Sequence, residues 1–182
     1  MPPRIQTARL LLRPWEFTDL EAVLEYAQDE AWARFLPVPR PYRREHAREF
    51  LARQILLDRA EHASWAIMFE EKTVGGINLR FSEAHRIAEM GYSIARPLWG
   101  RGLTTEAAAA VRDAAFTTYP ELERVRAMAD SRNRGSRRVM EKIGMQHEGT
   151  LRRNRLHQGE LVDEAWYGIL RSEWEARRQS VE

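Results

Sequence analysis

Hydrophobic residues recur at helical spacing in the first third of the chain. Leu20, Val23, Leu24 and Ala27 mark one face of a helix, and Thr18-x-x-Glu21 at its start is a capping-box sequence that predicts where the helix begins. A proline-punctuated loop at 35–42 then separates this helix from a second one. The face of the second helix consists of Ala47, Phe50, Leu51 and Ile55.

The pattern then changes to strand periodicity. Trp65, Ile67 and Phe69 alternate, residues 70–72 turn, and residues 74–81 return as the second strand of a hairpin. Further strands are expected at 88–94 and around 125–129, and 145–153 with 161–170 predict a final hairpin.

Two helices are interleaved with these later strands. An alanine-rich helix follows Gly102, and a shorter one near 136–143 stops at Gly144, a residue type suited to the position after a helix end. Residues 171–182 are expected to be a frayed helical end. No repeat or linker divides the chain, so the pattern predicts one mixed α/β domain spanning residues 1–182.

A two-glycine turn joins the strand at 88–94 to the alanine-rich helix. Gly100 and Gly102 allow the backbone to approach a ligand closely, and the first turn of the helix leaves N–H groups without partners inside the helix. These donors and the positive end of the helix dipole favour an anion, so the turn predicts a pyrophosphate cradle that holds part of a cofactor.

Two other interpretations of this turn stay open on the residues alone. Gly100-x-Gly102-x-x-Thr105 is part of a dinucleotide-binding fingerprint, although the βαβ start of that fold is missing. The glycines are also compatible with a tight turn of purely steric origin. A P-loop is excluded because no Lys-Ser/Thr pair follows the second glycine.

Composition narrows the chemistry. The chain has no cysteine, which excludes disulfides, thiolate metal sites and a cysteine nucleophile. No two of the five histidines stand at the i,i+4 spacing of a zinc helix, so no metal is expected. A signal segment and a run of about 18 apolar residues are both missing, which predicts a cytoplasmic protein without a membrane anchor.

The formal net charge is +2, and nearly all of the basic residues are arginine, with Lys72 and Lys142 as the lysines. The densest arginine cluster lies at 124–138 and continues at 152–155. No aromatic-rich RNA motif accompanies it, so we interpret the cluster as a rim that attracts cofactor phosphates and do not expect nucleic acid as a partner.

Several motifs, in order and spacing, give the chain a resemblance to a known family. They are Thr7 to Arg13, Trp65-Ala66-Ile67, Val74 to Ile77, Trp99 to Thr104, Asn133-Arg134-Gly135-Ser136, Val139 to Met145 and Glu148-Gly149. Together they resemble the GNAT superfamily of acyl-CoA-dependent N-acetyltransferases, and within it the branch that acetylates ribosomal-protein N-termini. Trp99 is typical of that branch, whereas Thr104 stands where the superfamily has Gly or Ala.

The resemblance implies a fold, a cofactor and an acceptor. The implied fold is a mixed, mostly antiparallel twisted sheet, split at a central strand pair and flanked by helices. The implied cofactor is acetyl-CoA, and the implied acceptor is a primary amine, foremost a protein N-terminus. A small-molecule amine as acceptor, or a non-catalytic acyl-CoA-binding module, remains an alternative, and a homodimer is one assembly that the sequence allows.

The resemblance also places the cofactor-binding residues on three segments. They are Tyr92, Ser93 and Ile94 on the strand, then Trp99, Gly100, Arg101, Gly102, Leu103, Thr104 and Thr105 in the cradle, and finally Asn133 and Ser136. Backbone groups of the strand would bind the pantetheine arm and the thioester oxygen. Arg101, Arg137 and Lys142 are candidates for the phosphates.

Two residues are proposed to act in catalysis. Glu89 shares a strand face with Gly91 and Ser93 and is the candidate base, with a solvated carboxylate as the alternative and Glu83 and His85 as rivals. Ser136 is the candidate group near the leaving sulfur, with a simple helix N-cap as the alternative and Tyr92 and Tyr167 as rivals.

The acceptor cleft is expected between two distant segments. One carries Trp15, Trp32 and Phe35, and the other is the final hairpin around 156–160. Aromatic residues at such spacing are also typical of a hydrophobic core.

Overall fold

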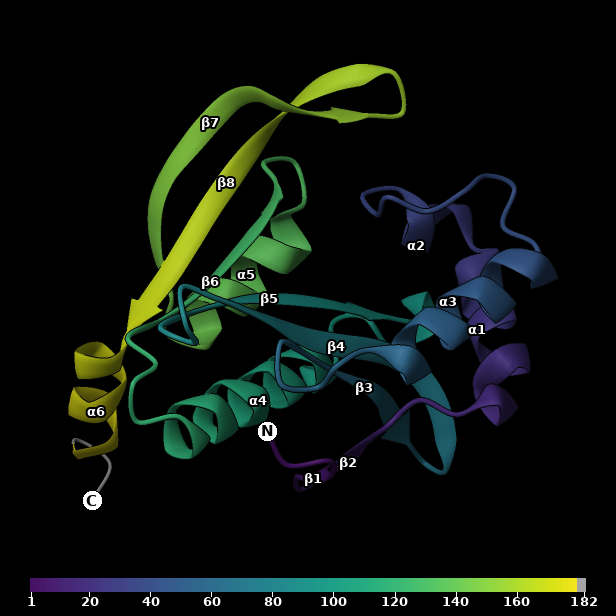
Figure 1. Ribbon diagram of the computed structural model, residues 1–182. Coiled ribbons are helices and arrows are strands. Elements are labelled where there is room, and N and C mark those ends of the chain that lie inside the picture. The colour runs from purple at the N-terminus through teal and green to yellow at the C-terminus, as the bar shows by residue number, and fades with distance from the viewer. Residues whose placement is uncertain (180–182) are drawn as a thin grey trace.

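The computed structural model describes residues 1–179 and contains one eight-stranded sheet (Figure 1). The strands are β1 (Ile5–Gln6), β2 (Leu10–Arg13), β3 (His62–Phe69), β4 (Lys72–Ser82), β5 (Ile87–Ile94), β6 (Arg124–Asp130), β7 (Gln146–His157) and β8 (Glu160–Leu170). The helices are α1 (Leu20–Ala27), α2 (Glu30–Ala33), α3 (Arg44–Leu56), α4 (Leu103–Thr118), α5 (Arg134–Lys142) and α6 (Arg171–Gln179).

The sheet is split at its centre. Its order is β1-β2-β3-β4-β5-β6-β8-β7, and β5 with β6 is the one parallel pair among the described strands. These two strands pair from Ile87 opposite Arg124 to Glu89 opposite Arg126, and beyond Glu89 no pairing joins them. The predicted mixed, mostly antiparallel sheet with a split central pair is therefore confirmed.

Helices cover both faces of the sheet and create two cores. One core packs α4, with Val111 and Phe116, against strand residues such as Trp65 and Tyr167. The other packs α1 and α3 against the opposite face through residues that include Trp15. In Figure 1, β7 and β8 extend as a long arm beyond the helical layers.

The entry into α1 differs from the prediction. The expected capping box of Thr18 and Glu21 does not form, because a 3₁₀ turn at Phe17–Asp19 precedes the helix. The carboxylate of Asp19 instead accepts the Glu16 N–H at 2.9 Å and binds the guanidinium of Arg13 at 2.6 Å. Glu21 lies on the surface and pairs with Arg44.

The end of the chain is helical up to the last described residues. α6 packs through Trp174, which is buried and stacks on Phe116 with ring centroids 5.1 Å apart. The expectation of fraying at 180–182 lies outside the described residues.

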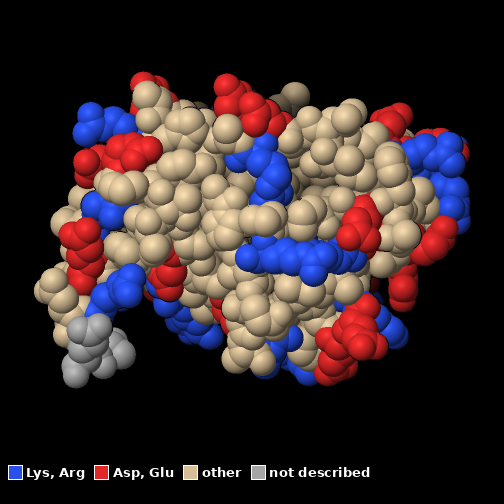
Figure 2. Space-filling view, turned by 60° about the horizontal axis from the view of Figure 1, so that its bottom comes forward, with Lys and Arg blue, Asp and Glu red and all other residues tan. Residues whose placement is uncertain are grey.

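Charged groups of both signs are interleaved on the face shown in Figure 2. Lys and Arg form one small cluster near its middle, and elsewhere on this face Asp and Glu lie beside them. No helix within residues 1–179 combines the length and apolarity needed to cross a bilayer.

Candidate active site

The cradle is built by two glycines with left-handed backbone. Gly100 and Gly102 have φ of +76° and +78°, a region that L side chains rarely adopt. The Glu106 N–H donates to the Gly102 carbonyl at 3.0 Å, and this is the first intrahelical hydrogen bond of α4. The N–H groups of Leu103, Thr104 and Thr105 therefore have no helical partner and line the mouth of the helix.

The segment just before β2 holds this turn in place. Arg9 donates to the Arg101 carbonyl at 3.1 Å and forms an ion pair with Glu106 at 2.6 Å. Burial alone would raise the pKa of the Glu106 carboxyl, but hydrogen bonds from Thr7 and Arg9 lower it. The side chain of Arg101 stacks on Phe69, with 4.9 Å between guanidinium carbon and ring centroid. The cradle is thus fixed to the sheet before any ligand binds.

The backbone of β5 faces the split at alternate residues. The Ala95 N–H donates to the Val74 carbonyl of β4 at 2.7 Å, so in an antiparallel ladder the groups of Ser93 also point towards β4. Those of Tyr92 and Ile94 point the other way, into the split. The Ile94 carbonyl is occupied there by the indole N–H of Trp99 at 2.9 Å. The backbone groups of Ser93 are therefore directed towards β4, and the expectation that they face the split is wrong.

Asn133 and Ser136 form the first turn of α5. The side-chain oxygen of Asn133 accepts the Ser136 N–H at 3.1 Å, so Asn133 is the N-cap and Ser136 is the third helical residue. The alternative in which Ser136 itself caps the helix is wrong. Its hydroxyl lies 3.1 Å from the phenol oxygen of Tyr92, which also donates to the Ser136 carbonyl. Burial raises the pKa of the Tyr92 phenol, so this group stays protonated.

Glu89 lies on the opposite face of the sheet from the Tyr92–Ser136 contact. Its carboxylate is 3.2 Å from a guanidinium nitrogen of Arg126, and its side chain is 26% exposed. The rivals Glu83 and His85 lie before β5, at the end away from the opening of the split, where His85 packs on Phe81. Of these three candidate bases, Glu89 is the one next to the split.

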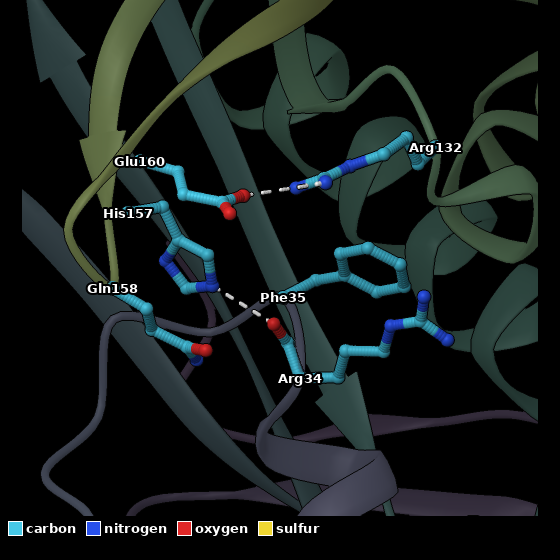
Figure 3. A pocket seen from close by; sticks show the side chains of 6 residues that line it. All are labelled: Arg34, Phe35, Arg132, His157, Gln158 and Glu160. Atoms are coloured by element: carbon cyan, nitrogen blue, oxygen red, sulfur yellow. Dashed lines mark hydrogen bonds and ion pairs between the residues drawn. The ribbon is translucent and has the colours of Figure 1, made fainter.

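A cavity of about 210 Å³ lies beyond the open end of the split (Figure 3). Its lining comes from the segment after α2, from the tip of the β7–β8 hairpin and from the loop before α5. The lining residues are Arg34, Phe35, Arg132, His157, Gln158 and Glu160. The position agrees with the cleft expected between Phe35 and the hairpin, whereas Trp15 and Trp32 are 5% and 8% exposed and belong to the second core.

Three arginines of this region have other places than the sequence suggested. Arg126 and Arg132 were assigned to the phosphate-attracting rim, but Arg126 pairs with Glu89 and Arg132 lines the cavity, where it pairs with Asp130. Arg34, which also lines the cavity, was not singled out by the sequence. Arginine is so frequent in this chain that its position alone carries no signal. The pairing register of β6 opposite Glu89 was the information that would have identified Arg126.

The candidate phosphate ligands outside the cradle are differently placed. The guanidinium of Arg137 donates to the phenol oxygen of Tyr167 at 3.0 Å and to the Ser131 carbonyl at 3.2 Å, so it is engaged within the fold.

Within residues 1–179, no group of three or more His, Asp and Glu side chains is arranged to hold a metal ion.

Comparison with known proteins places the chain in a family. A family model described as an acetyltransferase (GNAT) domain matches residues 9–146. The N-acetyltransferase YnaD of Bacillus subtilis is 32% identical over 170 residues, which cover 93% of this chain and 98% of that protein. YdaF of the same organism, named as a candidate ribosomal N-acetyltransferase, is 34% identical over 113 residues, covering 62% and 61% of the two chains.

A solved structure agrees with this relationship. RimL, a ribosomal L7/L12 α-N-protein acetyltransferase in complex with coenzyme A, superposes with a TM-score of 0.83 at 18% identity, covering 92% of this chain and 97% of RimL. At that identity the likeness shows the fold. The split sheet, the glycine cradle and the family match over most of the sequence lead to one conclusion: the chain belongs to the GNAT family of acetyltransferases.

Proposed function

We propose that this acetyltransferase transfers the acetyl group of acetyl-CoA directly to a primary amine, with the N-terminal amine of a protein as the leading acceptor. One observation carries the proposal. The opening between β5 and β6 leads to the free N–H groups of α4 through a turn whose two glycines have positive φ. A thioester on a long arm with a pyrophosphate fits that arrangement.

The cradle residues fit the phosphate end of CoA. Leu103, Thr104 and Thr105 offer N–H donors, and a Cβ added at Gly100 would enter open space where a ligand has room. Arg101 adds positive charge beside the turn. On the strand, the Tyr92 backbone groups and the Ile94 N–H face the split, where the pantetheine arm would lie, and the Nδ2 atom of Asn133 is free of the capping bond that its Oδ1 makes. Acetyl-CoA supplies an acetyl group activated as a thioester.

Glu89 is the proposed base. An ammonium acceptor must lose a proton before it attacks, and an N-terminal amine has a pKa near ~8, so a modest base suffices. The ion pair with Arg126 orients the Glu89 carboxylate on the face opposite α4 and α5. A water held by this carboxylate would carry the proton if the amine does not reach it directly.

Ser136 is the proposed partner of the leaving sulfur. The Tyr92 phenol lies 3.1 Å from both the carbonyl and the hydroxyl of Ser136, and either hydroxyl can donate to the other. With Tyr92 as the donor to the Ser136 hydroxyl, the hydrogen of that hydroxyl is available for the sulfur. A hydrogen bond from that hydroxyl stabilises negative charge on sulfur, although a serine is too weak an acid to give up its proton completely. Glu89 and Ser136 would then act from opposite faces of the split.

The acceptor class rests on the sequence motifs and on one relative. The segment from Asn133 to Met145 resembles the branch that acetylates ribosomal-protein N-termini, and YdaF carries a name of that kind. The cavity beyond the split is open enough to admit the end of a chain. Small amines fit the same fold and are the competing acceptors.

An acceptor screen tests the proposal. Thiol release from acetyl-CoA is measured with peptides that begin with alanine or serine, with the same peptides blocked at the N-terminus, and with polyamines and aminoglycosides. Release with the free peptides and none with the blocked ones supports the proposal. Turnover with small amines alone would show that the acceptor is a small molecule and not a protein N-terminus. The absence of turnover with every amine would indicate an acyl-CoA-binding module without catalytic activity.

A further inference from the structure

The two arginines that line the cavity beyond the split differ in their ion pairs. Arg132 donates to Asp130 at 2.8 Å, and its guanidinium lies 3.9 Å from the carboxylate of Glu160. Arg34 makes no ion pair with any carboxylate in residues 1–179, and its guanidinium lies 5.1 Å from the centroid of the Phe35 ring. Arg34 is therefore the arginine of the lining whose guanidinium is available to a carboxylate of a ligand.

The segment that carries Arg34 is fixed from two sides. The imidazole Nε2 of His157, at the hairpin tip, lies 2.8 Å from the Arg34 carbonyl. Asp29, which caps α2, forms an ion pair with Arg96 at 2.6 Å, next to the cradle turn. The segment thus spans from the cradle side of the split to the hairpin, and the position of Arg34 is determined by contacts of its own backbone rather than by its charge.

The cavity is also within reach of the reacting groups. Arg132 directly precedes Asn133, the residue that caps α5 and sets the position of Ser136. In Figure 3, Phe35 lies between the side chains of Arg132 and Arg34 and presents its ring to the cavity. A ligand would therefore meet the Phe35 ring, the side chains of Arg132 and Glu160, and the guanidinium of Arg34, which has no carboxylate partner within residues 1–179.

We propose that this cavity binds a carboxylate of the acceptor through Arg34, so that the preferred acceptors are amines that carry an acidic group. The inference rests on the proposed function and names the substrate class for it. A guanidinium is planar and offers parallel N–H donors that match a carboxylate, while the Phe35 ring packs against the stem of the acidic residue. The carboxylate comes either from an acidic side chain of a peptide or from a free amino acid.

Two pairs of acceptors that differ in charge test the proposal. The first pair consists of the peptides Ala-Glu-Ala and Ala-Gln-Ala, both as C-terminal amides. The second pair consists of L-alanine and L-alaninamide. Binding of each to the protein saturated with CoA is measured by calorimetry, which needs no turnover, and thiol release from acetyl-CoA is measured in parallel. In one of the two pairs, we expect the member with the carboxylate to bind at least about tenfold more tightly than the matching amide.

Variants assign this preference to Arg34. Arg34→Gln should abolish it, and Arg34→Lys should retain part of it because the charge remains. Arg48→Gln removes an exposed arginine on α3 that lines no part of the cavity, and it should leave the preference unchanged. The affinity for CoA should be the same in all three variants.

The outcomes separate the two proposals. A preference in the peptide pair identifies an acidic peptide as the source, and a preference in the other pair identifies a free amino acid. A carboxylate preference in binding without thiol release supports the cavity assignment and contradicts acetyl transfer. Equal binding within both pairs, or a preference that survives Arg34→Gln, would overturn the cavity assignment.

Discussion

The phenol oxygen of Tyr92 lies 3.1 Å from both the carbonyl oxygen and the hydroxyl of Ser136. Tyr92 comes from β5 and Ser136 from α5, so this contact ties the strand that borders the split to the helix on its far side. When Tyr92 donates its hydrogen to the serine hydroxyl, the contact orients that hydroxyl and leaves the serine hydrogen available for the sulfur.

Ser136→Ala and Tyr92→Phe distinguish the roles of this pair. If the serine hydroxyl is the group that stabilises the sulfur, Ser136→Ala should lower kcat by roughly 10-fold, as expected for the loss of one hydrogen bond to a charged atom. Tyr92→Phe should have a smaller effect, because only the orientation of the serine is lost. Steady-state kinetics with CoA affinity as the control measures both, and a larger loss in Tyr92→Phe would make the tyrosine the acid.

Glu89→Gln should lower turnover by roughly 10²-fold or more and leave CoA affinity nearly unchanged, because the swap keeps the shape and removes only the basicity. The wild-type rate should rise with pH and then level off as the acceptor amine deprotonates near ~8. The variant should recover part of its activity at alkaline pH, where the amine loses its proton unaided. If Glu89→Gln has wild-type kinetics at every pH, Glu89 is not the base. If the variant loses CoA binding, the role of Glu89 is structural.

Gly102→Ala should weaken CoA binding by tenfold or more. The added Cβ meets only a flexible Arg9 nitrogen at 3.6 Å within the protein, so the loss arises from the ligand side and from the φ of +78°. Gly144→Ala is the control, since Gly144 also has a positive φ, of +86°, but lies after the end of α5, where the added Cβ would be 3.0 Å from the flexible side chain of Arg177. Both variants should lose roughly 1 kcal/mol of stability, and calorimetry should find CoA affinity reduced in Gly102→Ala alone.

Asp130→Asn should destabilise the protein by about 1–3 kcal/mol near neutral pH. Hydrogen bonds from Arg132 hold the pKa of the buried Asp130 carboxyl below its usual range, so ionised Asp130 stabilises the fold at pH values above its unfolded pKa of about 3.9. The difference between wild type and variant should disappear as the pH falls through the lower pKa of the folded state. Urea titrations at several pH values measure it, with Glu25→Gln, an exposed change, as the control.

Local patterns predicted much of the fold. Alternation at Trp65, Ile67 and Phe69, the glycines before α4 and the glycine after α5 each lead to the observed element. These features are encoded within a few residues, so a single sequence suffices. The two-glycine turn before α4 was predictable for the same reason, because a turn and a helix start are local structures.

Features that depend on distant partners were not predictable. The start of α1 is decided by Asp19, whose carboxylate is bound by Arg13 and by the hydroxyl of Thr73, a residue on β4. In the same way Glu89 meets Arg126 only through strand pairing, and Arg34 lacks a carboxylate partner because of where the carboxylates of residues 1–179 lie. Side-chain pairing across the sheet is a property of the tertiary fold, so the spacing of residues along the chain does not predict it.

A thermal-shift titration with CoA tests the central claim most directly, namely that the turn at Gly100 and Gly102 is a CoA cradle. A ligand that binds only the folded state adds about 2.7 kcal/mol of stability at a hundredfold excess over its Kd. CoA and acetyl-CoA should therefore raise the Tm, whereas NADH should not, and Gly102→Ala should reduce the shift. The absence of a shift with CoA, or a larger shift with NADH, would contradict the account.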